Sequence, residues 1–326
     1  VIAQTGLAIS QPFILNAVTA VSVRWFPLRE RGMAAGLSAL AQYLGIIVAM
    51  LVTPAMVGSD PAEPGYGAGF DSMLSIYGWL TFGVAVVTLV LLRERPPTPP
   101  GEDSLERHSF TKGIAHILKL RDMQITLLLF FVGLGIFNAV SSMTDAIAEN
   151  AGVQDSDGLI GGLMLIGGIL GASILPILSD KTRKRKIFLV ICVAGMVPGV
   201  FGLTFAGSLS SNPDTVYAIS LAASFILGFF IMSAGPLGFQ YAAEVSYPAP
   251  ESTSQGMLLW VGQVTGMIFV AGMSMRDNQY LPDFMVAFSI LSLFSLGMIL
   301  LLRESPMIIT EQDRVAGVTR EGRLDP

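Results

Sequence analysis

Residues 159–209 read LIGGLMLIGGILGASILPILSDKTRKRKIFLVICVAGMVPGVFGLTFAGSL, which is two apolar runs joined by a short basic loop. Each run, 159–178 and 187–209, is close to the ~20 residues that an α-helix needs to cross the hydrocarbon core of a bilayer. The loop between them, residues 179–186, carries five Lys and Arg residues, and the runs themselves carry none. The pattern predicts two transmembrane helices joined by a charged turn at one membrane surface.

The rest of the chain has the same character. Of its 326 residues, 52% are hydrophobic and only 13% are charged, whereas about a quarter of an ordinary soluble domain is charged. The apolar segments are too long and too evenly apolar to be barrel strands, so we expect helices throughout. The sequence therefore predicts an all-α membrane protein with nine spans, at residues 1–23, 34–56, 73–92, 123–144, 159–178, 187–209, 216–242, 255–275 and 283–302.

Positive charge falls on every second loop of this arrangement. Of the 19 Lys and Arg residues, only Arg276 lies outside four groups, which fall within residues 24–31, 93–121, 181–186 and 303–323. Lys and Arg accumulate in short cytoplasmic loops, so these four regions are predicted to face the cytoplasm. We expect a multi-pass protein of the cell membrane with a cytoplasmic C-terminus.

The order of the spans suggests two unequal groups. The chain opens inside an apolar segment, and with the loop at Arg24 cytoplasmic, one or three helices are expected upstream. A hydrophilic insertion then separates three spans from six. If the six form a complete half, three upstream helices would make twelve in all. The predicted domains are 1–92 for the last three helices of a first half, 93–122 for a cytoplasmic linker, 123–302 for a second six-helix half and 303–326 for a cytoplasmic tail.

The linker contains one short segment with helical periodicity. Ile114, Ile117 and Leu118 fall on one face of a helix there. Such a helix can lie along the inner membrane surface, or it can pack on neighbouring loops. The pattern alone does not separate these alternatives.

The chain resembles the major facilitator superfamily, whose transporters have two six-helix halves joined by a long cytoplasmic loop. The resemblance is carried by SDKTRKRK at 179–186, where Asp180 closes a span and basic residues follow. It implies that the chain holds nine of twelve transmembrane helices, helices 4–12. A carboxylate at a helix end can pair with cations in one transporter state and release them in another. We therefore predict gating roles for Asp180, Arg183 and Arg185. The alternative is that these cations only satisfy the positive-inside rule.

Two further loops resemble the branch of this superfamily related to the feline leukaemia virus subgroup C receptor. One runs from QPFILN at 11–16 through WFP at 25–27 to ERG at 30–32, and the other is EVSYPAPE at 244–251. The resemblance implies a carrier of choline, ethanolamine or haem-related substrates. We include Arg31 and Glu244, which lie in these loops, among the predicted gating residues.

The same resemblance implies a substrate pocket. Gln42 and Gln263 match glutamines of the branch's pocket and are expected to face each other across a cavity. Asn138 aligns with a tyrosine that helps to cage a quaternary ammonium, so one cation–π contact is absent here. With Asn16, these residues are the predicted substrate contacts. Because buried amides are costly in lipid, the alternative role for each is hydrogen bonding between helices.

The centres of the nine predicted spans hold no Asp, Glu, Lys or Arg. Proton-coupled carriers generally need a titratable group in the pathway, so a facilitative carrier is favoured. One alternative is an exporter of amphipathic compounds, lined by residues such as Phe137, Trp260 and Met273. Another is a membrane receptor or scaffold that does not transport.

Glycines are frequent in the span at 159–178, namely Gly161, Gly162, Gly167, Gly168 and Gly171. Small residues allow helices to approach closely. We expect these glycines to lie at the moving interface between the halves, although static packing notches would give the same pattern.

The residue inventory argues against catalysis. Both histidines, His108 and His116, lie in the linker, and the single cysteine, Cys192, lies within a span. The sequence shows no metal-ligand cluster, nucleophile motif or phosphate-binding glycine loop. We expect no enzymatic activity, no metal site, no cofactor and no nucleic-acid partner. The expected partners are a small-molecule substrate and the lipid bilayer, with the protein acting as a monomer.

Overall fold

The computed structural model describes residues 31–58, 67–91, 110–155, 158–182 and 184–305. It also describes the single positions Gly6, Ser10, Gln11, Ile14, Ala17, Val21, Trp25, Phe26, Gly65 and Arg93. The predicted span at 1–23 and the tail after Ser305 therefore lie largely or wholly outside the described residues. All regular structure in the described ranges is helical, which confirms the predicted all-α class.

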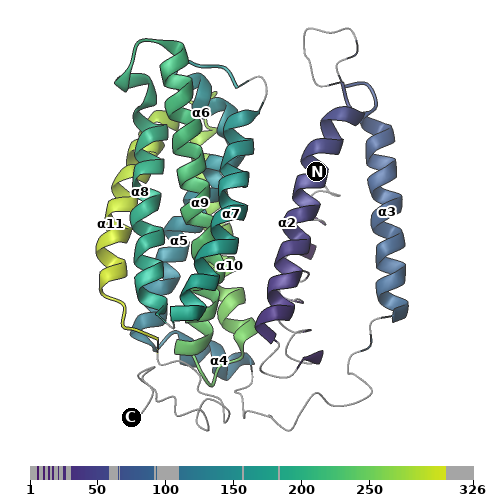
Figure 1. Ribbon diagram of the computed structural model, residues 1–326, viewed down its shortest axis with the longest axis vertical. Helices are drawn as coiled ribbons and strands as arrows, with labels where there is room; N and C mark the ends of the chain where they lie inside the picture. The colour runs from purple at the N-terminus through teal and green to yellow at the C-terminus, as the bar shows by residue number, and fades with distance from the viewer. Residues whose placement is uncertain are drawn as a thin grey trace. The chain divides into compact units, whose positions relative to one another are not determined.

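The chain divides into two compact units, residues 1–104 and 105–326. The first contains α2 (Arg31–Met56) and α3 (Phe70–Leu91). The second contains α4 (Phe110–Ile117), α5 (Arg121–Ser142), α6 (Thr144–Asn150), α7 (Leu159–Thr182), α8 (Arg185–Leu209), α9 (Pro213–Val245), α10 (Glu251–Met273) and α11 (Leu281–Leu300). Seven of the described helices, α3, α5 and α7–α11, are long and apolar enough to cross a membrane. Figure 1 shows these helices as long rods.

Backbone hydrogen bonds join the two described ends of the connection between α2 and α3. Gly58 donates its amide to Ala68 O at 3.0 Å and accepts from the Gly67 amide at 2.8 Å. Gly69 has a φ of +88°, and a side chain there would overlap Met56 O. Glycine is needed because the left-handed region is open to it without steric cost.

The core of the second unit is built around α9. α7 and α8 both pack on α9, α11 packs on α8 and α5, and α5 packs on α10 (Figure 1). The largest buried side chains include Leu227 and Tyr241 of α9 and Phe288 of α11, each with 0% of its surface exposed. α9 has 33 residues, or about 50 Å of helix. It begins before and ends after the predicted span at 216–242. At its start, Asn212 accepts a hydrogen bond from the Asp214 amide at 3.0 Å and begins the helix early.

Glycines of α7 set the distance of closest approach between α7 and α9. A Cβ on Gly167 would lie less than 3.0 Å from Phe225 O, and one on Gly171 would collide with Phe229 O. From the other side, a Cβ on Gly228 would overlap Met164 O. Gly167, Gly168 and Gly171 therefore serve packing within one unit, as the second of the two sequence interpretations held. Their assignment to a moving interface between halves was wrong.

The short helix α4 packs against α10 and the loop that precedes it. Ile117 is completely buried and clusters with Met123, Ala249 and Leu258. A Cβ on Gly113 would touch the Pro250 ring at 3.0 Å. Leu118, on the other hand, is 50% exposed. Of the two alternatives for this segment, the structure favours packing on a neighbouring loop.

Candidate functional site

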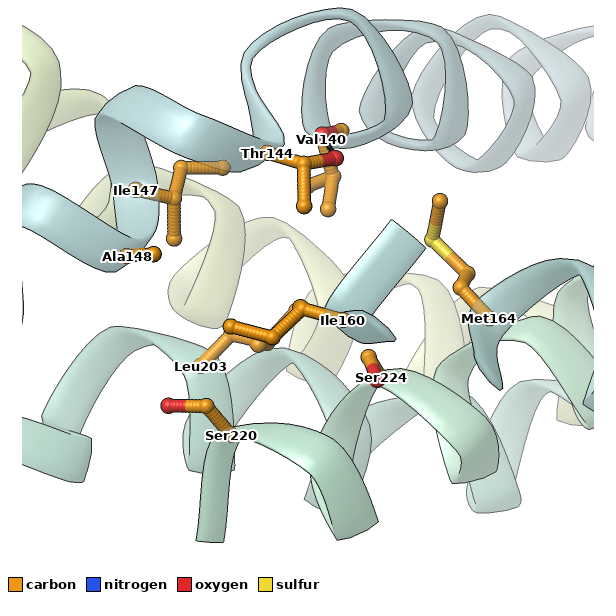
Figure 2. Close-up of a pocket in the computed structure, with 9 residues that line it drawn as sticks. All are labelled: Val140, Thr144, Ile147, Ala148, Ile160, Met164, Leu203, Ser220 and Ser224. Carbon is orange, nitrogen blue, oxygen red and sulfur yellow. Dashed lines mark hydrogen bonds between the residues drawn. The ribbon is translucent and has the colours of Figure 1, made fainter. Parts of the chain in front are cut away.

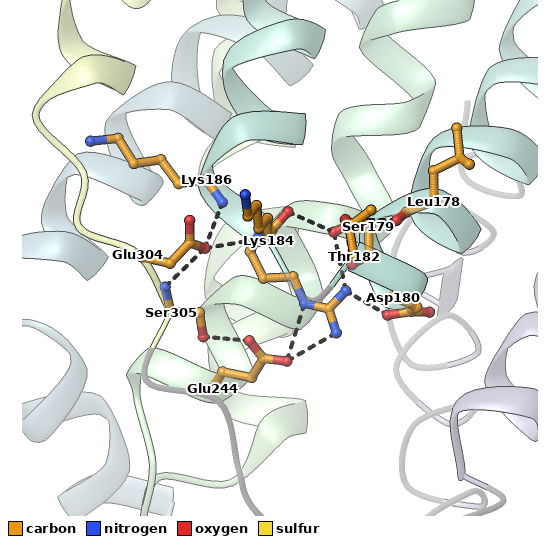
Figure 3. A network of polar contacts seen from close by, with 10 residues as sticks. Leu178, Ser179, Asp180, Thr182, Lys184, Lys186, Glu244, Glu304 and Ser305 are labelled. Carbon is orange, nitrogen blue, oxygen red and sulfur yellow. Dashed lines mark hydrogen bonds and ion pairs between the residues drawn. The ribbon is translucent and has the colours of Figure 1, made fainter. Parts of the chain in front are cut away.

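A buried arginine lies where three helices of the second unit meet. Arg185 is the first residue of α8, and its side chain is only 7% exposed. Its Nη1 donates to Asp180 Oδ1 at the end of α7, at 2.5 Å, and its Nε and Nη2 both lie 3.3 Å from Glu244 Oε1 of α9 (Figure 3). Three of the five predicted gating residues are thus brought together.

The two carboxylates in this network differ in exposure. The Glu244 side chain is 10% exposed, whereas that of Asp180 is 55% exposed. A buried carboxylate depends on its cation because the alternative is an uncompensated charge in a medium of low dielectric. An exposed carboxylate can exchange the same cation for water at little cost. α7 makes a further, buried contact, because Arg185 Nη1 also donates to the Ser179 hydroxyl at 3.1 Å. Among the described side chains that bind the Arg185 guanidinium, Asp180 is therefore the exposed partner, and Glu244 and Ser179 are the buried partners.

Of the other predicted gating residues, Arg183 lies outside the described residues. Arg31 is the first residue of α2, but its side chain also lies outside the description. Both stay predictions.

Two residues of the network were not anticipated from the sequence. Glu304, after α11, accepts backbone hydrogen bonds from Arg185 at 2.8 Å and Lys186 at 2.9 Å. The Ser305 hydroxyl donates to the second carboxylate oxygen of Glu244 (Figure 3). Glu304 is 119 residues from Arg185, so no local spacing could have revealed the contact.

The second candidate site is an amide pair between α5 and α10. Asn138 Nδ2 donates to Gln263 Oε1 at 3.1 Å and to Gly262 O at 3.4 Å. The helices approach closely because Gly266 faces Asn138, and a Cβ on Gly266 would lie 2.6 Å from Asn138 Cβ. Gln263 is exposed and Asn138 is half-buried. Within the described part of the chain, Asn138 Oδ1 and Gln263 Nε2 have no other partner, so the pair presents one acceptor and one donor group.

The other predicted contacts lie in the first unit or outside the described residues. Gln42 is exposed on α2, in the first unit, and Asn16 lies outside the described residues. The expected juxtaposition of Gln42 and Gln263 stays a prediction. Of the residues considered as an exporter lining, Met273 is fully buried in the core, whereas Trp260 is 68% exposed.

A small cavity in the second unit is not a substrate site (Figure 2). It has a volume of about 10 Å³, which is no more than one water molecule needs. It is lined by Val140, Thr144, Ile147, Ala148, Ile160, Met164, Leu203, Ser220 and Ser224. The hydroxyls of Thr144, Ser220 and Ser224 donate to backbone carbonyls three or four residues earlier in the chain, at 2.9, 3.0 and 2.9 Å. Each hydroxyl hydrogen is therefore already used in a bond to the backbone and is not available to a ligand.

The opposite end of α7 is also anchored to α9. Asp155 accepts from the amides of Leu159 and Ile160, each at 2.9 Å, and from the Tyr217 hydroxyl at 3.0 Å. A carboxylate at a helix N-terminus satisfies free amides and favours the dipole. α7 is thus tied to α9 at both ends, by Asp155 at one and Arg185 at the other.

These features define a class of protein. Membrane-length helices in a six-helix bundle, with a charge network at one end of it, define an all-helical, multi-pass membrane protein. The sequence profile of the Major Facilitator Superfamily matches residues 1–271, and the chain belongs to this superfamily. Its members are transporters rather than enzymes.

Similar proteins support the predicted branch. The chain is 29% identical over 271 residues to solute carrier family 49 member A3 of Xenopus tropicalis, covering 82% of this chain and 54% of the relative. It is 28% identical over 285 residues to the choline/ethanolamine transporter flvcr2a of Danio rerio, covering 82% and 57%. It is 25% identical over 293 residues to the choline/ethanolamine transporter FLVCR2 of Homo sapiens, covering 86% and 54%. The FLVCR-like resemblance is confirmed, and the chain spans about half the length of these relatives.

Proposed function

We propose that the protein is a facilitative carrier of choline, ethanolamine or a related small organic solute, working by alternating access. The observation that carries the proposal is the Asn138–Gln263 pair, which presents unused hydrogen-bonding groups on the exposed side of α5 and α10. A hydroxyl both donates and accepts, so the pair matches the hydroxyl end of an amino alcohol. Two relatives are named choline/ethanolamine transporters, which supports the same substrate class.

The absence of charge within the membrane supports facilitation without proton coupling. In the described helices, Asp, Glu, Lys and Arg lie only near the ends, as Asp71 does in α3 and Asp214 in α9. A proton-coupled carrier generally places a titratable group along the pathway. We propose that the protein acts as a monomer in the cell membrane, with the Arg185 end of the bundle and the C-terminus in the cytoplasm.

We assign the inner gate to Asp180, Arg185 and Glu244, with Arg183 and Arg31 as further candidates. Asp180 is the member suited to exchange partners, because it is exposed while Glu244 is buried. Release of Asp180, together with the bond from Arg185 to the Ser179 hydroxyl, would let the end of α7 move while Arg185 stays bound to α9. A transporter gate requires this kind of two-state contact.

Replacing Gln263 by alanine is expected to lower uptake of radiolabelled choline by about tenfold or more. The variant removes one substrate donor and leaves the Asn138 amide with only its longer bond to Gly262 O, each a loss of about 1 kcal/mol or more. The measurement is saturable uptake into proteoliposomes by the full-length parent protein, with and without a proton gradient. Asn138→Ala and Gln42→Ala are expected to act in the same direction.

Met267→Ala is the matched control, because Met267 lies one turn further along α10 and is 67% exposed. Its uptake should equal that of the parent. Normal uptake by Gln263→Ala would remove the pocket assignment. Failure of the parent to carry either choline or ethanolamine would remove the substrate class and make export of amphipathic compounds the next activity to test.

A further inference from the structure

The start of α8 has the wrong charge for a helix N-terminus. Its first residues are Arg185 and Lys186, preceded by Lys184, and its first turn has no acidic residue and no side-chain cap from its N-cap residue. Free amides and the positive end of the dipole favour an anion at this position. The local sequence supplies three cations instead.

Glu304, which follows α11 in the sequence, supplies the missing anion. Its Oε1 accepts the amides of Arg185 and Lys186, and the Ser305 amide at 3.3 Å. In return, Lys186 Nζ donates to Leu300 O at the end of α11, at 3.1 Å. The two helix ends therefore cap each other, anion to N-terminus and cation to C-terminus.

The segment that carries Glu304 is itself anchored at several points. Tyr241 of α9 donates its hydroxyl to Arg303 O at 2.8 Å. The Arg303 amide lies 3.3 Å from Asp122 Oδ1 of α5. Ser305 is only 6% exposed, and its hydroxyl donates to Glu244. Residues 303–305 thus connect α5, α8 and α9 at one end of the bundle.

These contacts converge on the proposed gate. Glu304 holds the backbone of Arg185, and Ser305 occupies the Glu244 oxygen that Arg185 does not use. We infer that Glu304 is a positioning residue of the gate, and that residues 303–305 form a latch that sets Arg185 between Asp180 and Glu244. The inference rests on the proposed gating function.

The sequence contains this element twice. The chain reads LLRERP at residues 91–96, beginning at the last residue of α3, and LLRESP at 301–306, beginning directly after α11. Each copy lies at the end of the last described helix of its unit and places a Glu three residues after the first Leu. An element repeated at corresponding points of two units indicates a role beyond the chance capping of one helix.

The first test is amide hydrogen exchange on the purified full-length parent, which needs no substrate. Glu304→Ala is expected to lower protection of the first turn of α8 by about fivefold or more, the size expected for loss of a helix cap. Glu304→Gln keeps an acceptor and should show a smaller loss. Asp155→Ala removes an equivalent cap from α7 and should expose Leu159 and Ile160 while leaving Arg185 protected. Unchanged protection at Arg185 in Glu304→Ala would overturn the inference.

The second test asks whether Glu304 acts through the gate. The readout is the ratio of choline exchange to net choline uptake in proteoliposomes, because a gate controls the return of the empty carrier. Asp180→Asn and Glu304→Gln should each change the ratio by about threefold or more, and the double variant should match one single variant rather than their product. Asp155→Asn combined with Asp180→Asn should instead be multiplicative.

The outcomes separate the two proposals. A multiplicative effect of Glu304→Gln with Asp180→Asn would overturn the latch while leaving the carrier intact. No effect of Asp180→Asn alone would remove both the gate and the latch. If the parent carries no choline, the substrate proposal fails, and hydrogen exchange alone decides whether Glu304 positions Arg185.

Discussion

Replacing Gly228 by alanine is expected to prevent stable assembly of the second unit. A Cβ at this position would overlap Met164 O, and the nearest atoms are backbone atoms of α7 that no rotamer change can move aside. α7 and α9 would have to separate, which breaks the buried contacts on both sides of the crossing. Overpacking costs about 1–3 kcal/mol where side chains can adjust, and we expect at least the upper end here. The measurement is the yield of monodisperse protein and its thermal unfolding.

Gly235→Ala is the matched control for this substitution. Gly235 lies two turns further along the same helix, but no atom lies within 4 Å of its Cβ position. Because alanine favours helix by about 1 kcal/mol over glycine, this variant should be as stable as the parent or more stable. Equal loss of stability in the two variants would show that α9 needs glycine for a reason other than its contact with α7.

Arg185→Leu is expected to be the most damaging substitution in the charge network. It leaves the Glu244 carboxylate, 10% exposed, without a cation. Breaking a buried ion pair by removing one partner costs about 3–5 kcal/mol. We expect lower thermal stability together with loss of choline transport. Arg185→Lys should be intermediate, since one ammonium cannot reproduce the two bonds to Glu244 and the bond to Asp180. Lys184→Ala, which removes an exposed neighbouring cation, should leave stability unchanged.

A double variant separates stability from gating. Replacing a buried pair by uncharged groups is often neutral, so Arg185→Leu combined with Glu244→Gln should recover much of the stability lost in Arg185→Leu. Transport should stay low, because Asp180 still lacks its partner. Recovery of transport along with stability would mean that the network holds the helices together and has no gating role.

Features that depend on neighbouring residues could be predicted from the sequence, whereas contacts between residues far apart in the chain could not. Hydropathy placed α7 and α8 correctly to within a few residues, because the length of an apolar segment and the charges that flank it are properties of the local sequence. The pairing of Asp180 with Arg185 was also predictable, as the two residues lie five apart across one turn. Glu304 could not be found this way, because it caps a helix that begins far from it in the chain.

For other residues the sequence allowed two roles and could not decide between them. Asn138 and Gln263 were both candidates for the substrate site, but their mutual hydrogen bond depends on the crossing of α5 and α10 at Gly266. The glycines of α7 fitted a sliding interface and a fixed contact equally well. Only the position of α9 against them distinguishes the two, and that position follows from the packing of the whole unit.

The hydrogen bond between the Arg303 amide and the Asp122 carboxylate places the beginning of α5 and the end of α11 at the same point. The first and last residues of this six-helix segment therefore lie next to each other. Such a unit is suited to circular permutation, because a short peptide could join its ends while new termini are opened in the turn at 277–279. It is equally suited to duplication or fusion, since a second unit could be joined at these adjacent ends without changing the arrangement of the helices in the first.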